Sequence, residues 1–154
     1  MSFWYDLLLT VEQECKNILD PNLESKVEFF RGFMVSDSAI RVTTQGVDHS
    51  FDGHEGVETE YMTSYNLVVY LRTEHPDLNI LMDTLFQQAS VLSFGLFTSD
   101  NIRSLASTGP GTQQEYYTDY QPLEIIPVNL SDGSGTGFVG EVGVSFIVQS
   151  RREL

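Results

Sequence analysis

The stretch Val57 to Arg72 reads VETEYMTSYNLVVYLR and alternates two sets of side chains. One set is apolar, aromatic or threonine throughout, whereas the other begins with Glu58 and Glu60 and becomes apolar only near its end. Because successive side chains of a strand point to opposite faces, this period of two predicts one long β-strand. We expect it to begin exposed and to end inside a covered sheet. Its length exceeds the usual ~10 residues, so we also expect part of it to project from the body of the domain.

Two helical stripes lie on either side of this strand in the sequence. Trp4, Leu8, Val11, Cys15 and Ile18 recur at steps of three and four, which predicts an amphipathic helix from Ser2 to Leu19. The proline at position 21 is expected to end it. A second stripe predicts a helix from Pro76 to Leu92; it comprises Leu78, Leu81, Met82, Leu85, Phe86, Ala89 and Leu92. Residues 94–97 fit either a strand or the end of that helix, and residues 99–101 carry a capping signal for a further turn through Leu105.

The remaining segments have strand and turn composition. Residues 27–35 and 39–44 predict two short strands in a hairpin, and the polar, glycine-containing residues 45–56 predict a loop. Residues 116–130 predict a strand that lies at an edge or is bulged, because Pro122 and Pro127 cannot donate to a ladder. After a turn at 131–137, residues 138–149 predict a last strand that pairs antiparallel with it. The sequence therefore predicts a single α+β domain over residues 1–154, with a mainly antiparallel sheet and two amphipathic helices packed on it.

The charge balance excludes several classes of function. The 154 residues contain 8 Lys+Arg and 22 Asp+Glu, a formal charge of −14. A chain this acidic cannot neutralise a row of phosphates, so gripping nucleic acid or an anionic membrane is disfavoured. The most apolar run, residues 80–97, is interrupted by Asp83 and several polar residues, and we expect no membrane span. The single cysteine, Cys15, lies on an apolar stripe and is expected to be buried rather than reactive. The first residues lack a basic secretory region, which favours synthesis in the cytoplasm.

Motifs for catalysis and cofactor binding are absent from the sequence. It contains no phosphate loop, no dinucleotide fingerprint and no nucleophile elbow, so we expect no enzyme, no catalytic or cofactor-binding residue and no cofactor. The glycines between 133 and 140 fit a flexible hairpin. Acids and histidines that could ligate a cation are concentrated in one segment: Asp48, His49, Asp52, His54, Glu55, Glu58 and Glu60. They lack the spacing of a calcium loop and include no cysteine, so a solvated acidic loop is favoured and no metal site is predicted.

The order of these elements resembles the tail-terminator proteins of long-tailed bacteriophages. The resemblance depends on size, on the strand ending YNLVVYLR (65–72) and on the closing strand with GVSFIV (143–148), and it covers nearly the whole chain. It implies a homo-oligomeric ring, usually a hexamer, on the head-proximal end of the tail tube. Such a ring stops tube growth and contacts the tail tube protein and the head-tail connector. The implied location is the virion, with DNA only passing through the channel. The segments 45–61 and 99–116 are longer than in a minimal member.

Physical reasoning adds a candidate surface and two alternatives. Acidic side chains facing a channel would repel passing DNA, and ring assembly would occupy strand edges. The candidate channel or interface acids are Glu55, Glu58, Glu60, Glu115 and Asp119. The first alternative is another phage neck, connector or tail-tube component. A more distant one is a small metal-binding or enzymatic domain built around residues 48–60.

Overall fold

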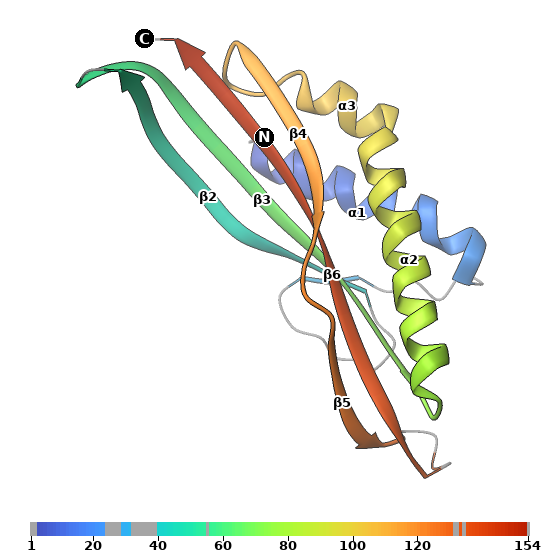
Figure 1. Cartoon of the computed structure of the whole chain (residues 1–154). Coiled ribbons are helices and arrows are strands. Elements are labelled where there is room, and N and C mark those ends of the chain that lie inside the picture. The colour runs from blue at the N-terminus through green and yellow to red at the C-terminus, as the bar shows by residue number, and fades with distance from the viewer. Residues whose placement is uncertain are drawn as a thin grey trace.

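Two long antiparallel strands form the centre of the sheet. In the computed structural model, β3 (Val57–His75) pairs with β6 (Thr136–Glu153) from Glu60↔Glu153 to His75↔Phe138 (Figure 1). The structure describes residues 3–23, 29–31, 40–54, 56–130, 133 and 135–153. The long strand predicted from the alternating stretch 57–72 is confirmed, and it continues for three more residues.

Four shorter strands flank this central pair. β2 (Ile40–His54) pairs antiparallel with β3, and β1 (Phe29–Arg31) pairs parallel with the start of β2. On the other side, β4 (Gln113–Tyr120) and β5 (Glu124–Asn129) both pair antiparallel with β6, one beyond the other along its length. The sheet order is β1-β2-β3-β6-β4, with β5 also on β6.

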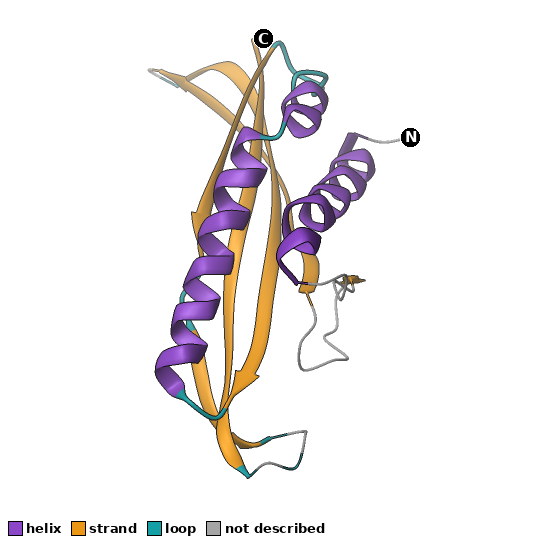
Figure 2. Ribbon diagram, turned by 90° about the vertical axis from the view of Figure 1, so that its right-hand side faces the viewer, coloured by secondary structure: helices purple, strands orange, loops and turns teal. Residues whose placement is uncertain are grey.

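The three helices in the described part of the chain lie on the same side of the sheet (Figure 2). They are α1 (Phe3–Leu23), α2 (Leu78–Thr98) and α3 (Asp100–Ala106). The Asp77 carboxylate begins α2 by accepting hydrogen bonds from the backbone N–H groups of Asn79 (2.9 Å) and Ile80 (3.2 Å). Ser99 caps α3, because its hydroxyl accepts from the Ile102 N–H at 3.2 Å. The predicted α+β class, with helices packed on an antiparallel sheet, is confirmed.

The core lies between the helices and one face of the β3–β6 pair. Alternate residues of each strand point into it, and the helices add their apolar stripes. Its fully buried side chains include Leu7, Val11, Cys15, Leu67, Val69, Leu81, Leu85, Leu92, Leu96, Val144, Phe146 and Val148. Each large aliphatic or aromatic side chain buried here stabilises the fold by about 1.5–3 kcal/mol. Cys15 is buried as expected, and burial raises the pKa of its thiol.

The segment before the long strand differs from its sequence-based prediction. Residues 45–54 were expected in a loop, but they continue β2 to His54, and β3 begins directly after the turn residue Gly56. The backbone groups of this polar stretch are paired with β3, which its side-chain composition does not reveal. The expected hairpin of residues 27–35 with 39–44 is also wrong, because β1 runs parallel to β2.

Three other boundaries differ from expectation. The strand expected at 116–130 is two strands, β4 and β5, with a break at residues 121–123 that contains Pro122. Pro127 sits in β5, which has no outer neighbour among the described strands, as an edge proline requires. Residues 94–97 belong to α2, so the helix alternative was correct. α1 continues through Pro21 to Leu23, so the expectation that this proline ends the helix is wrong.

Of the described helices, α2 alone is long and apolar enough to cross a membrane by length and composition, with a mean hydropathy of 1.3. The expectation that no segment is long and apolar enough to span a membrane is therefore wrong by length and composition. A third of the window is buried inside the domain, and Leu81, Leu85, Ala89 and Leu92 pack in the core. The sheet-facing side of α2 thus has the apolar character of a core helix.

Candidate channel and assembly surfaces

The face of the sheet that carries no helix is rich in carboxylates. On the helix side, β3 presents Leu67 and Val69 and β6 presents Val144 and Phe146, so the intervening residues point the other way. Alternation along the paired strands places the following acids on this helix-free face: Asp48, Glu60, Glu74, Glu115, Asp119, Glu124, Glu141 and Glu153. The described basic side chains on the same face are Arg72 and Arg151. This face therefore carries a negative charge across the sheet.

Three of the five candidate acids come together on this face. Glu60, Glu115 and Asp119 share it, and the last two are exposed on β4. Glu58 belongs to β3, opposite Gly53, and Glu55 lies outside the described residues. The Asp119 carboxylate accepts a hydrogen bond from the Tyr120 N–H at 2.8 Å, which holds it beside its own backbone. The described candidates thus lie along two strands, β3 and β4, on either side of β6.

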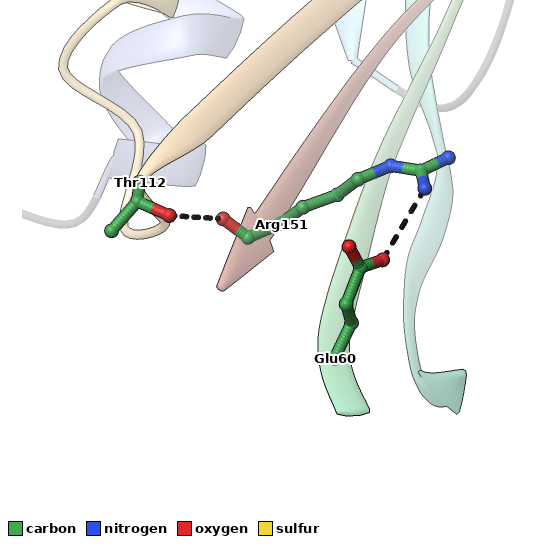
Figure 3. Close-up of polar contacts among 3 residues, drawn as sticks. All are labelled: Glu60, Thr112 and Arg151. Atoms are coloured by element: carbon green, nitrogen blue, oxygen red, sulfur yellow. Dashed lines mark hydrogen bonds and ion pairs between the residues drawn. The ribbon is translucent and has the colours of Figure 1, made fainter. Parts of the chain in front are cut away.

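Glu60 is paired with a cation. Its Oε2 lies 3.5 Å from Nη1 of Arg151, and both side chains are about one-third exposed (Figure 3). An ion pair of this exposure contributes at most about 1 kcal/mol. Arg151 also connects to the loop before β4. The Thr112 N–H donates to the Arg151 carbonyl oxygen at 2.8 Å. The Thr112 hydroxyl donates to the same oxygen at 3.4 Å (Figure 3). One residue therefore links the acidic face to the start of β4.

A shallow hollow interrupts the helix-free face where β4 ends. It has a volume of about 190 Å³ and is lined by Tyr70, Gln121, Pro122, Glu124 and Glu141. Glu124 and Glu141 lie directly opposite each other in the β5–β6 register, and Arg72 lies opposite Glu141 in β3. Two like charges at one register position destabilise an isolated sheet. The Arg72 guanidinium at the same register position offsets part of this repulsion, and two acids to one base leave the row negative.

Both long edges of the sheet are open among the described residues. β1 covers only Ile40–Val42 of β2, and no described strand pairs with the outer side of β4. An open edge presents unpaired backbone N–H and C=O groups and is a template for another strand. The strands β2-β3-β6-β4 are successively antiparallel, so the two edges run in opposite directions.

The end of the β2–β3 hairpin carries an aromatic cluster on the helix side. The Tyr61 hydroxyl lies 2.6 Å from His49 Nδ1, which also lies 3.0 Å from the Thr63 hydroxyl. The rings of Phe51 and Tyr61 meet edge to face at 5.5 Å, and Phe51 is 56% exposed. The Nδ1 atom of His49 is therefore hydrogen-bonded within the hairpin.

The metal alternative for residues 48–60 gains nothing from this geometry. Strand alternation sends Asp48 and His49 to opposite faces, and Asp48 accepts a hydrogen bond from the Asn66 amide at 3.5 Å. Within the described part of the chain, no group of three or more His, Cys, Asp or Glu side chains is placed to hold a metal ion. The side chains of Asp52, His54 and Glu58 lie outside that part.

The outer side of α2 is apolar and exposed. Phe94 is 71% exposed, Phe86 50% and Phe97 46%, and the only charged residue among the 21 of α2 is Asp83. Sequence reasoning assigned one apolar stripe to this helix and missed the second. The signal was present, because Ile80, Val91, Phe94 and Phe97 do not fit the stripe that faces the sheet. A helix that is apolar all round is usually covered all round.

Comparison of the chain with models of known protein families and with curated proteins finds no match.

Proposed function

We propose that this protein is a subunit of a ring that closes the head-proximal end of a phage tail tube and joins it to the head connector. The observation that carries the proposal is an acidic, helix-free sheet face bounded by two open edges that run in opposite directions. This arrangement lets identical copies join side by side without changing the strand pattern. It also supports a function in which the sheet lines an opening.

Edge direction favours a head-to-tail contact between copies. If β2 of one copy approaches β4 of the next, the two strands are antiparallel, like all the neighbours between β2 and β4. A head-to-tail contact generates a ring when the rotation between copies closes. In such a ring every copy keeps its helices on one side and its acidic face on the other. Because this face is acidic, the ring would not recognise a base sequence in DNA.

The sign of the charge fits passage rather than binding. DNA carries one negative charge per ~1.7 Å of helix axis, so a channel lined by carboxylates repels it and prevents it from sticking. In the proposed ring, Glu60, Glu115 and Asp119 face the channel, together with Glu124 and Glu141. The helices then form the outer wall. The tube protein and the head connector are the partners at the two ends of the opening.

The test combines the mass of the assembly with its effect on tubes. Light scattering after size exclusion, across protein concentration and salt, should give a defined multiple of 17.4 kDa, and electron microscopy should show closed rings. Salt should promote assembly, because it screens the repulsion between copies of charge −14. Rings added to growing tail tubes should stop their elongation. Elongation into tubes by this chain itself would favour a tube component. A chain that stays monomeric and leaves tube length unchanged would contradict the proposal.

A further inference from the structure

The flank of α2 that faces the open β4 edge is an uncovered apolar surface. Phe86, Ser93 and Phe97 lie seven and four residues apart and so share one side of the helix. That side faces β4, because the Ser93 and Thr118 hydroxyls are 2.9 Å apart and the Phe97 ring lies 5.8 Å from the ring of Tyr116. Phe86, Phe94 and Phe97 together expose roughly 300 Å², if a whole aromatic side chain has a typical area of 150–250 Å². A patch of this size on a single chain is commonly functional.

A second uncovered apolar surface lies at the opposite edge of the same sheet. Tyr65 of β3 is covered by α1, since its ring lies 5.1 Å from Phe3 and 5.4 Å from Trp4. Further along the hairpin this cover ends, and Phe51 is exposed on the helix side of β2. The two surfaces cannot meet within one copy, because β3 and β6 separate β2 from β4.

We propose that the hairpin end of one copy, residues 47–61, docks beside β4 of a second copy and covers the β4-facing flank of its α2. The inference rests on the proposed ring and names its interface. Adding β2 to the β4 edge continues the sheet, so the helix side of the incoming hairpin lies next to α2 of the receiving copy. The two surfaces lie at the same level along the strand direction. Phe51 pairs with Tyr61, which pairs with Arg152, and β4 begins opposite the neighbouring Arg151.

Charge is distributed so that the helix sides of the two surfaces can meet. Alternation along β2 and β3 places His49, Phe51 and Tyr61 of the hairpin end on the helix side, and Asp48 and Glu60 on the helix-free face. The receiving surface has a single acid on α2, and two exposed arginines lie on its helix side near the start of β4. They are Arg103, whose Nε donates to the Tyr116 hydroxyl at 3.1 Å, and Arg152. On the helix-free face Asp48 comes beside Glu115 and Asp119, and salt screens this repulsion between copies of charge −14.

A photo-crosslinking experiment tests the contact without requiring its register. Benzoylphenylalanine replaces Phe51, and the protein is mixed with an equal amount of ¹⁵N-labelled protein, so that adducts between copies are recognised by mass. The matched control carries the same probe at Ile126, which is also 56% exposed but lies on the helix-free face of β5. We expect mixed-isotope adducts from position 51 to residues 86–120, and none to that segment from position 126.

Other outcomes separate this inference from the proposed function. Adducts from position 51 to the hairpin of the second copy, to α1, or to no second copy at the highest soluble concentration would overturn the interface. If closed rings nevertheless form and stop tube growth, the proposed function stands without it. Adducts to 86–120 in an assembly that has no effect on tubes would support the interface and contradict the proposed function.

Substitutions give an independent measure. Phe51→Ser and Phe97→Ser should each raise the protein concentration needed for half-assembly about tenfold, whereas Ile126→Ser should not. The double variant Phe51→Ser/Phe97→Ser should be little worse than either single one, because both remove the same contact. Circular dichroism confirms that each variant is folded. Independent, additive effects of the two substitutions would contradict a direct contact.

Discussion

The Glu14 carboxylate accepts a hydrogen bond of 2.8 Å from the hydroxyl of Ser99, a residue 85 positions away in the sequence. The same carboxylate accepts from the Asn101 amide at 2.9 Å and from the Asn17 amide at 3.1 Å. Glu14 is buried on α1, and Ser99 is both the end of α2 and the cap of α3. One buried carboxylate therefore connects all three helices above the sheet.

Replacing this carboxylate should destabilise the domain. Glu14→Ala leaves the Ser99 and Asn101 donors without their acceptor, and we expect a loss of about 1–3 kcal/mol in the free energy of unfolding. Urea denaturation of the variant and of Glu115→Gln, an exposed acid, measures the difference. The Glu115 variant should match the parent within about 0.5 kcal/mol. Equal stability of all three proteins would show that the three-helix connection contributes nothing.

The contribution of Glu14 should depend on pH. Burial, the largest single effect, raises the pKa of Glu14, but the hydrogen bonds from Asn101, Ser99 and Asn17 together lower it below its ordinary value. A group with a lowered folded-state pKa stabilises the fold above its unfolded pKa, near 4.5 here, and this stability is lost as pH falls through the folded value. The stability difference between the parent and Glu14→Gln should thus be full at pH 6 and shrink below pH 4.5. A difference that grows on acidification would contradict this sign.

Gly111 should tolerate no side chain. A Cβ at this position would collide with the carbonyl of Arg151 and come within 2.6 Å of the Ser150 hydroxyl, which accepts the Gly111 N–H at 2.7 Å. Gly111→Ala should therefore displace the start of β4 and cost about 1–3 kcal/mol. Gly109→Ala is the matched control, because the three atoms nearest to a Cβ there belong to the Gln114 side chain and not to the backbone. Thermal unfolding compares the two, and a smaller loss at Gly111 than at Gly109 would be inconsistent with this packing.

Substitutions on the two sides of α2 should have very different effects on stability. Leu92 is fully buried, and Leu92→Ala should cost about 2–5 kcal/mol through the cavity it leaves. Phe94→Ser removes a larger apolar group from a 71% exposed position and should change stability by less than about 0.5 kcal/mol. Denaturant titration of both variants checks the orientation of the helix. A severe loss at Phe94 would mean that this side is covered within the single chain.

Neutralising acids on β4 should change assembly but not folding. Glu115→Gln with Asp119→Asn removes two exposed charges from the helix-free face, so unfolding should be unaffected. If this face lines a closed ring, the pair should reduce the salt needed for assembly and slow the passage of DNA through it. Asp6→Asn with Glu12→Gln, which removes two charges from α1, is the control for a general charge effect. Equal behaviour of the two variants would separate these acids from the proposed channel.

Patterned segments of the sequence were predicted well. The period of two identified β3 and most of β6, and the three-and-four spacing identified α1 and α2, because each side chain in those elements is sorted by burial against one core. Residues 45–54 and the parallel pairing of β1 were missed. The polar composition of residues 45–54 predicts a loop, whereas backbone pairing with β3 makes them a strand, and β1 is set by its parallel pairing with β2. The same limit applies to the site. Glu60, Glu115 and Asp119 were chosen for charge and position, whereas Phe86, which is half exposed, was assigned to the stripe that faces the sheet, and Phe94 and Phe97 were assigned to no surface.

The sequence by itself determined the α+β class, the long central strand, the two main helices and the charge of −14. These follow from the periodicity of burial and from composition, which are properties of local sequence. Only the tertiary structure decided that all three helices cover one face, which leaves the carboxylates of the other face together. It also decided that β2 and β4 form opposite open edges, because strand order depends on contacts between residues distant in the chain.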